Sequence, residues 1–186
     1  MRIIGHEKRV VGVMAMNLNV GDHISADVPD WSREKPRRFW DPDRKLLLNH
    51  RRYQYWRSKQ GLLPGLLRRL FVLFYRFWSV VTGSNIDLLA EIGGGLLIPH
   101  ANGIVIHPRA KIGVNCLIHQ QVTIGELGKA DDGVPVIEGH VNIYAGAKVL
   151  GPIRVGAHAT IGVNSVVFVD VPARATVLGV PAKRIG

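Results

Sequence analysis

Three of the eight histidines lie where the chain could use them for proton transfer. His100 comes just before Asn102-Gly103, where a repeat in the sequence slips by two residues. His107 and His119 each follow a large apolar residue. A neutral imidazole held at a rigid bulge can remove a proton from a hydroxyl near neutral pH, as a general base does. His100 is therefore the first candidate for a base, and His119 is the second.

The segment that must position these residues runs from Ile86 to Val171 and has a period of six. Neither a helix nor an amphipathic strand has this period, whereas six-residue repeats are typical of a parallel β-helix. One position of the hexad is always Ile or Val, with a two-residue slip after Ile104 and a loop after Ile124. These residues are Ile86, Ile92, Ile98, Ile104, Ile106, Ile112, Ile118, Ile124, Ile137, Ile143, Val149, Val155, Ile161 and Val167.

Four residues after each of these positions the side chain is usually small, as at Ala90, Ala110 and Ala147. Alternating large and small side chains can fill a narrow prism at native density. We therefore expect a mainly β fold with a β-helix over residues 85–172. Residues 1–42 are expected to be irregular, residues 43–84 to form basic amphipathic helices, and residues 173–186 to be a tail that leaves the coils.

His140 and His158 are three hexads apart, so they should stack on one solvated face of neighbouring coils. The zinc site of the gamma-class carbonic anhydrases needs a His-x-x-x-x-His spacing, and no two histidines of this chain have it. No metal site is predicted, and a zinc hydratase is the weakest hypothesis for the function.

A polar, glycine-containing break from Glu126 to Pro135 interrupts the hexad phase. Excursions of this kind from a rigid scaffold commonly bind ligands, so we expect a binding loop here.

The net charge of +10 is concentrated before the repeats, and no RNA- or DNA-binding motif accompanies it. We therefore predict no nucleic-acid partner. Asp41-Pro42-Asp43 indicates the start of a helix that runs from about Arg44 to Lys59. A second helix is expected from Pro64 to Thr82, before Gly83.

The second helix is very apolar but contains three arginines, and its longest unbroken apolar run, Leu70 to Tyr75, is too short to span a bilayer. Two compatible interpretations stay open. The helix caps the end of the β-helix or packs against partner subunits. Alternatively, residues 64–82 lie on a membrane surface with their arginines on anionic headgroups.

Cys116 is the single cysteine and falls on a small interior position, so a packing role is favoured over a reactive thiol. One cysteine cannot form an internal disulfide and fits a reducing compartment. Residues 1–13 lack the layout of a signal peptide. We expect a cytoplasmic protein, working at the inner face of the cell membrane if the second helix binds lipid.

Several stretches resemble the hexapeptide-repeat acyltransferases, most closely their serine acetyltransferase-like branch. They are IGGG (92–95), HANGIV (100–105), VTIG (122–125), YAGAKVLG (144–151), GVNSVV (162–167) and GVPAK (179–183). They follow one another in order over residues 86–186. The resemblance implies a homotrimer of left-handed β-helices, with acetyl-CoA as co-substrate in the groove between neighbouring subunits.

By this resemblance His100 is the catalytic base, which deprotonates an acceptor hydroxyl as its oxygen attacks the thioester. Asn85 takes the place of the carboxylate that orients this histidine, and Asp87 is a substitute two residues away. Asn102 and His119 are candidates for contact with the acceptor. The resemblance also implies a cofactor-binding set for acetyl-CoA: Gly125 near the oxyanion, Ala145 and Val163 along the pantetheine arm, and Lys183 at the phosphates.

Two departures from the serine acetyltransferases bear on the acceptor. Pro99 stands where they have Asp before the catalytic His, and Val134 stands where they have His before a proline. These changes remove charged groups that would recognise a small amino acid. The remaining resemblance is to acetyltransferases of exopolysaccharide, capsule and colanic acid assembly.

We therefore predict O-acetylation of a sugar hydroxyl of a polysaccharide or its precursor. The alternative within the same enzyme class is serine O-acetylation in cysteine biosynthesis. The alternative outside it is a non-catalytic β-helix scaffold at the membrane.

Overall fold

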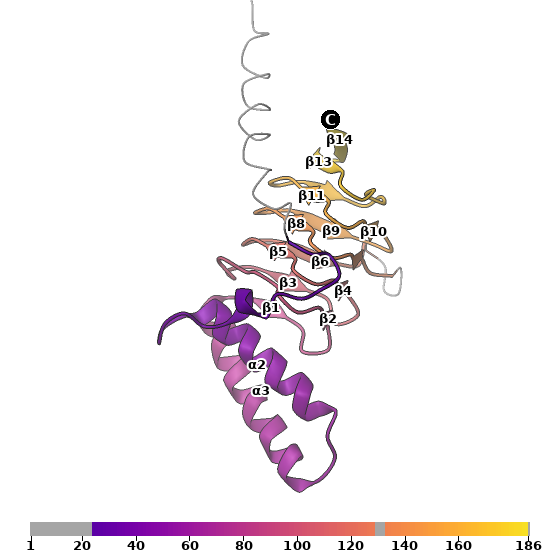
Figure 1. Cartoon of the computed structure of the whole chain (residues 1–186). Helices are drawn as coiled ribbons and strands as arrows, with labels where there is room; N and C mark the ends of the chain where they lie inside the picture. The colour runs from indigo at the N-terminus through magenta and orange to yellow at the C-terminus, as the bar shows by residue number, and fades with distance from the viewer. Residues whose placement is uncertain (1–23, 129–132, 186) are drawn as a thin grey trace, which may run out of the picture.

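The computed structural model describes residues 24–128 and 133–185, so most of the predicted irregular segment and the middle of the predicted binding loop lie outside the described residues. Figure 1 shows a helical hairpin at one end of a stack of coils. The predicted fold class, a mainly β, left-handed parallel β-helix with an N-terminal helical segment, is confirmed.

Three sheets form the three faces of the prism, and most coils contribute one short strand to each face. The first and last coils each contribute a single bridging residue, Leu97 and Val171, to one face. The first sheet contains β1 (Asn85–Ile86), β3 (Val105–Ile106), β6 (Thr123–Gly125), β9 (Lys148–Leu150) and β12 (Val166–Val167). The second contains β2 (Glu91–Ile92), β4 (Lys111–Ile112), β7 (Val136–Ile137) and β10 (Arg154–Val155). The third contains β5 (Leu117–Ile118), β8 (Asn142–Ile143), β11 (Thr160–Ile161), β13 (Thr176–Gly179) and β14 (Ala182–Ile185).

The hexad positions stack in register inside the prism. Ile86 lies opposite Ile106, Ile106 opposite Ile124, and Ile124 opposite Val149, all buried. Cys116 is also buried, and burial raises the pKa of its thiol to about 12, which agrees with the predicted packing role.

The C-terminal residues leave the parallel coils later than the predicted boundary at residue 173. β13 pairs in parallel with β11 and adds a strand to the third sheet, and β14 turns back antiparallel to β13. The last coil is two residues shorter than the coil before it, since Val155 pairs with Val171 whereas Val149 pairs with Val167. Counting in steps of six therefore no longer identifies the interior positions after Val167. Val177 is an interior position that this count misses, since it is buried.

The hairpin consists of α2 (Pro42–Arg57) and α3 (Leu62–Thr82), which ends at Gly83 in a left-handed conformation. Tyr75 and Trp78 of α3 and Leu46 and Leu47 of α2 belong to the same apolar core as the first coils. The predicted capping of the prism by the helices is therefore confirmed. None of the helices in the described ranges is long and apolar enough to cross a bilayer.

Residues 24–34, which we call the strap, run along the prism before α2 and include the short 3-10 helix η2 (Trp31–Glu34). The buried side chain of Asn115 holds the strap. Its amide nitrogen donates to the carbonyls of Ser25 (2.7 Å) and Val28 (2.8 Å), and its oxygen accepts from the N–H of Asp30 (2.7 Å).

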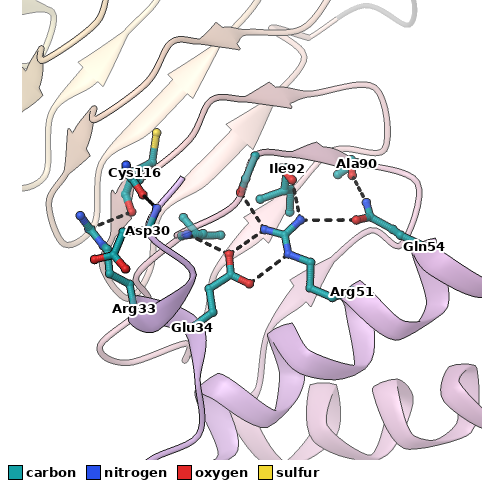
Figure 2. Close-up of polar contacts among 11 residues, drawn as sticks. Asp30, Arg33, Glu34, Arg51, Gln54, Ala90, Ile92 and Cys116 are labelled. Carbon is teal, nitrogen blue, oxygen red and sulfur yellow. Dashed lines mark hydrogen bonds and ion pairs between the residues drawn. The ribbon is translucent and has the colours of Figure 1, made fainter. Parts of the chain in front are cut away.

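A buried ion pair joins the strap, α2 and the first coil (Figure 2). The guanidinium of Arg51 donates to both carboxylate oxygens of Glu34, at 2.8 and 3.0 Å, and to the carbonyls of Ile92 and Gly93. Glu34 also accepts from the N–H of Leu96 at 3.0 Å. Arg51 and Glu34 thus hydrogen-bond to each other and each to the backbone of the first coil. These shared hydrogen bonds fix the hairpin against the prism.

His50 of α2 should make the fold sensitive to acid. Burial lowers its pKa from 6.5 to about 4, and the nearby charge of Arg51 adds to the effect. The unfolded chain therefore binds this proton between pH 6.5 and 4 while the folded chain does not. We expect His50 to cost no stability above pH 6.5 and roughly 2–3 kcal/mol by pH 4.5. Urea unfolding at both pH values measures this loss, and an equal loss in His50→Gln would contradict the assignment.

Candidate active site

His100 lies in a two-residue insertion at one edge of the prism, where the chain turns from the third sheet to the first. Leu97 pairs with Leu117, and Gly103 packs beneath Gln121, so the lower segment is two residues longer than the upper. The bulge predicted from the phase slip is confirmed. The side chain of His100 is exposed, whereas the next residue, Ala101, is buried.

Asp43 holds the backbone of this insertion. Its carboxylate, in the first turn of α2, accepts a hydrogen bond of 2.9 Å from the buried N–H of Ala101. The helical hairpin thus fixes the peptide unit directly after His100. The sequence analysis missed this contact because Asp43 was interpreted only as part of a helix start.

Five of the nine predicted site residues lie along this one edge of the prism. Successive coils are joined there by backbone hydrogen bonds: Gln121 N–H to Asn102 C=O, Gly146 N–H to Gln120 C=O, and Asn164 N–H to Ala145 C=O. The candidate base, both candidate acceptor contacts and two candidate acetyl-CoA contacts therefore follow one line up the prism. They are His100, Asn102, His119, Ala145 and Val163.

His119 faces a second ring on this edge. Its imidazole stacks on Tyr144 with the centroids 5.2 Å apart and the planes 21° from parallel. Burial lowers the pKa of His119, and the charge of nearby His100 adds to this shift. Both effects favour the neutral imidazole, which can donate one hydrogen bond and accept another. Tyr144 was not identified from the sequence.

The remaining predicted residues lie elsewhere. Asn85 is exposed at the start of β1, next to the edge that contains His100. Asp87 and Gly125 lie at the following edge, and the carboxylate of Asp87 accepts from the N–H of Leu89 at 2.7 Å. Lys183 is exposed on β14. Within residues 24–128 and 133–185 neither Asn85 nor Asp87 hydrogen-bonds to His100, so the orienting partner stays a prediction.

The His140–His158 pair stacks as predicted, with the two Nδ1 atoms 2.8 Å apart. The prediction that both rings are solvated is wrong, because His140 is only 6% exposed. The strap causes the difference, since Ala26 lies against the neighbouring Gly139. In the part of the chain that the structure describes, no group of three or more His, Cys, Asp or Glu side chains could hold a metal ion.

No family model matches the chain. Curated relatives do match it: it is 40% identical to the serine acetyltransferase of Synechococcus elongatus over 147 residues, which are 77% of this chain and 57% of the relative. It is also 40% identical to the serine acetyltransferase of Mycobacterium tuberculosis over 136 residues, 73% of this chain and 57% of the relative.

Solved structures of serine acetyltransferases are also similar to this chain. A serine acetyltransferase in complex with CoA superimposes with a TM-score of 0.65 and 34% identity, covering 79% of this chain and 58% of that one. The soybean serine acetyltransferase complexed with serine gives 0.64 and 37%, covering 75% and 56%.

Over most of its length the chain is therefore similar to the serine acetyltransferase branch of the hexapeptide-repeat proteins. It spans less than two thirds of the length of the relatives it matches. These relatives support the serine acetyltransferase branch and not the predicted closeness to the polysaccharide O-acetyltransferases.

Proposed function

We propose that this protein is an acetyl-CoA-dependent O-acetyltransferase in which His100 is the general base. The observation that supports it best is the shared edge, where an exposed imidazole on a fixed insertion lies in line with Ala145 and Val163. The relationship to serine acetyltransferases, one of them solved with CoA, gives independent support.

In the proposed reaction His100 takes the proton of the acceptor hydroxyl as the oxygen attacks the thioester carbonyl of acetyl-CoA. The tetrahedral oxyanion collapses, the C–S bond breaks, and the CoA sulfur leaves with the proton from the imidazolium of His100. Gly125 lies at a different edge from His100, so backbone N–H groups near Gly125 of a neighbouring subunit are proposed to stabilise the oxyanion. No covalent enzyme intermediate forms, so His100 serves first as base and then as acid.

The proposal includes a homotrimer with acetyl-CoA between neighbouring subunits. Ala145 and Val163 would contact the pantetheine arm, and the exposed ammonium of Lys183 would meet the CoA phosphates. A cytoplasmic location suits this co-substrate and the single buried cysteine.

L-Serine is the acceptor that the relatives favour, because those named above are serine acetyltransferases and one was solved with serine. A sugar hydroxyl of a polysaccharide precursor is a second candidate. Pro99 and Val134 favour it, since neither side chain can pair with the ammonium or carboxylate of an amino acid. Contact of residues 64–82 with the inner face of the membrane would suit a lipid-linked sugar substrate but does not depend on it.

Release of free CoA thiol from acetyl-CoA tests the proposal, with L-serine, nucleotide sugars and polysaccharide repeat units offered as acceptors. Turnover with serine at a rate far above every sugar would establish the first candidate. Turnover with a sugar alone would establish the second. Thiol release no faster than without protein, for every acceptor, would contradict acetyl transfer and favour the scaffold.

Asp43 should affect the rate through the position of His100. Asp43→Ala leaves the buried N–H of Ala101 without an acceptor and frees the insertion, so we expect kcat to fall about tenfold with KM for acetyl-CoA little changed. Asp43→Asn keeps an acceptor oxygen and should recover most of the rate. Asp170→Ala is the matched control, since Asp170 accepts from the N–H of Arg154 far from His100. An equal fall in the control would contradict a positioning role.

A further inference from the structure

The outward face of α3 is a row of large apolar side chains that we call the α3 stripe. Its members follow one another at steps of three or four residues, so they share one face of the helix. They are between 41% and 96% exposed. The stripe consists of Leu62, Leu66, Leu70, Leu73, Phe77 and Val80.

The capping role of α3 does not account for the stripe. The helix packs on the prism through another face, where Tyr75, Trp78 and Thr82 are buried and the Tyr75 hydroxyl donates to the carbonyl of Ile86. Single exposed apolar residues are ordinary on a protein surface, but a continuous row about 27 Å long marks an interaction site.

Charge indicates what the stripe contacts. Residues 62–82 contain three arginines and no acidic residue, and residues 42–82 together contain nine Lys or Arg and a single acidic residue, Asp43. Arg69 lies one turn from Leu66 and Leu73. Arg76 lies one turn from Leu73 and Val80. Both exposed guanidinium groups therefore flank the stripe. A second copy of the same face would present a row of like charges, whereas an anionic lipid surface would present opposite ones.

Aromatic residues extend the apolar surface toward the start of α2. Trp78 packs edge-on against Phe77 and against Trp40, which is itself 56% exposed. The exposed Trp40 is therefore placed as tryptophans often are at the boundary between lipid headgroups and acyl chains.

We propose that the α3 stripe docks the protein on an anionic bilayer, with the apolar side chains in the headgroup–acyl boundary and Arg69 and Arg76 on lipid phosphates. This docking uses no residue of the candidate active site. It would therefore hold or fail independently of the proposed acetyl transfer.

Co-sedimentation of the full chain with vesicles tests the proposal. The protein should bind vesicles of equal parts phosphatidylcholine and phosphatidylglycerol and should bind phosphatidylcholine alone far more weakly. The double variant Leu66→Glu, Leu73→Glu should bind the mixed vesicles at least tenfold less tightly. Replacing Arg69 and Arg76 by Gln should weaken binding about fivefold per arginine and remove the preference for the anionic lipid.

Val169→Glu is the matched control, because it changes an equally exposed apolar residue on the β-helix and should leave vesicle binding unchanged. Thiol release without vesicles should be the same in the stripe variants as in the unchanged protein, which separates docking from catalysis. Absence of vesicle binding by the unchanged protein would overturn the proposal. So would a stripe variant that dissociates the oligomer in sedimentation velocity but still binds vesicles, since the stripe would then be a subunit interface.

Discussion

Replacing His100 by alanine should lower kcat/KM for acetyl transfer by about 10²–10⁴-fold, the usual contribution of a general base. The thermal stability should hardly change, because the side chain is exposed and, within the described residues, makes no hydrogen bond. Thiol release and a melting curve on the same preparation measure both effects.

Two further histidines make the result specific. His119→Ala should reduce the rate less than His100→Ala, since His119 is a candidate contact for the acceptor and stacks on Tyr144. His158→Ala changes a half-buried ring at a different edge and should leave the rate unaltered. A dead His119→Ala beside an active His100→Ala would move the base to His119.

Replacing Glu34 by alanine should lower the free energy of unfolding by about 3–5 kcal/mol, as expected when one partner of a buried ion pair is removed. Glu34 is 7% exposed, and the side chain of Arg51 is 17% exposed. The variant leaves the guanidinium without its counter-charge and the N–H of Leu96 without its acceptor. All four tryptophans lie within residues 31–78, so urea unfolding followed by tryptophan fluorescence reports this region directly.

Glu34→Gln keeps one acceptor oxygen and should cost less than Glu34→Ala. Glu91→Ala is the surface comparison, because Glu91 and Lys111 form an exposed pair at 3.4 Å. That change should cost no more than about 1 kcal/mol. Equal losses in the buried and the surface variants would show that the Glu34 cluster does not fix the hairpin.

The prism and the line of candidate residues along its edge could be predicted because both follow from a short repeat. Ile106 and Ile124 stack at the same interior position of successive coils. Each residue between them is thereby assigned to a face or to an edge of the prism. The same reasoning failed at Val171 and Val177, where the last coil is two residues shorter and the phase changes.

Contacts between distant residues could not be predicted. The acceptor for Ala101 is Asp43, 58 residues earlier, and the partner of Arg51 is Glu34, in a segment without any periodicity. The burial of His140 depends in the same way on the strap. The acceptor stays the least determined part of the site, because Pro99 and Val134 exclude charged contacts without providing others.

The strap has a consequence for the order in which the molecule folds. Neighbouring coils join residues about twenty apart, such as Ile86 and Ile106, so they can stack one after another as the chain leaves the ribosome. Ser25 and Asn115 are 90 residues apart, and Ala26 needs Gly139. Because closing long loops costs more entropy and slows folding, the strap should attach after these coils have formed. Among the described residues, the first to be synthesised are thus expected to be among the last to reach their native place.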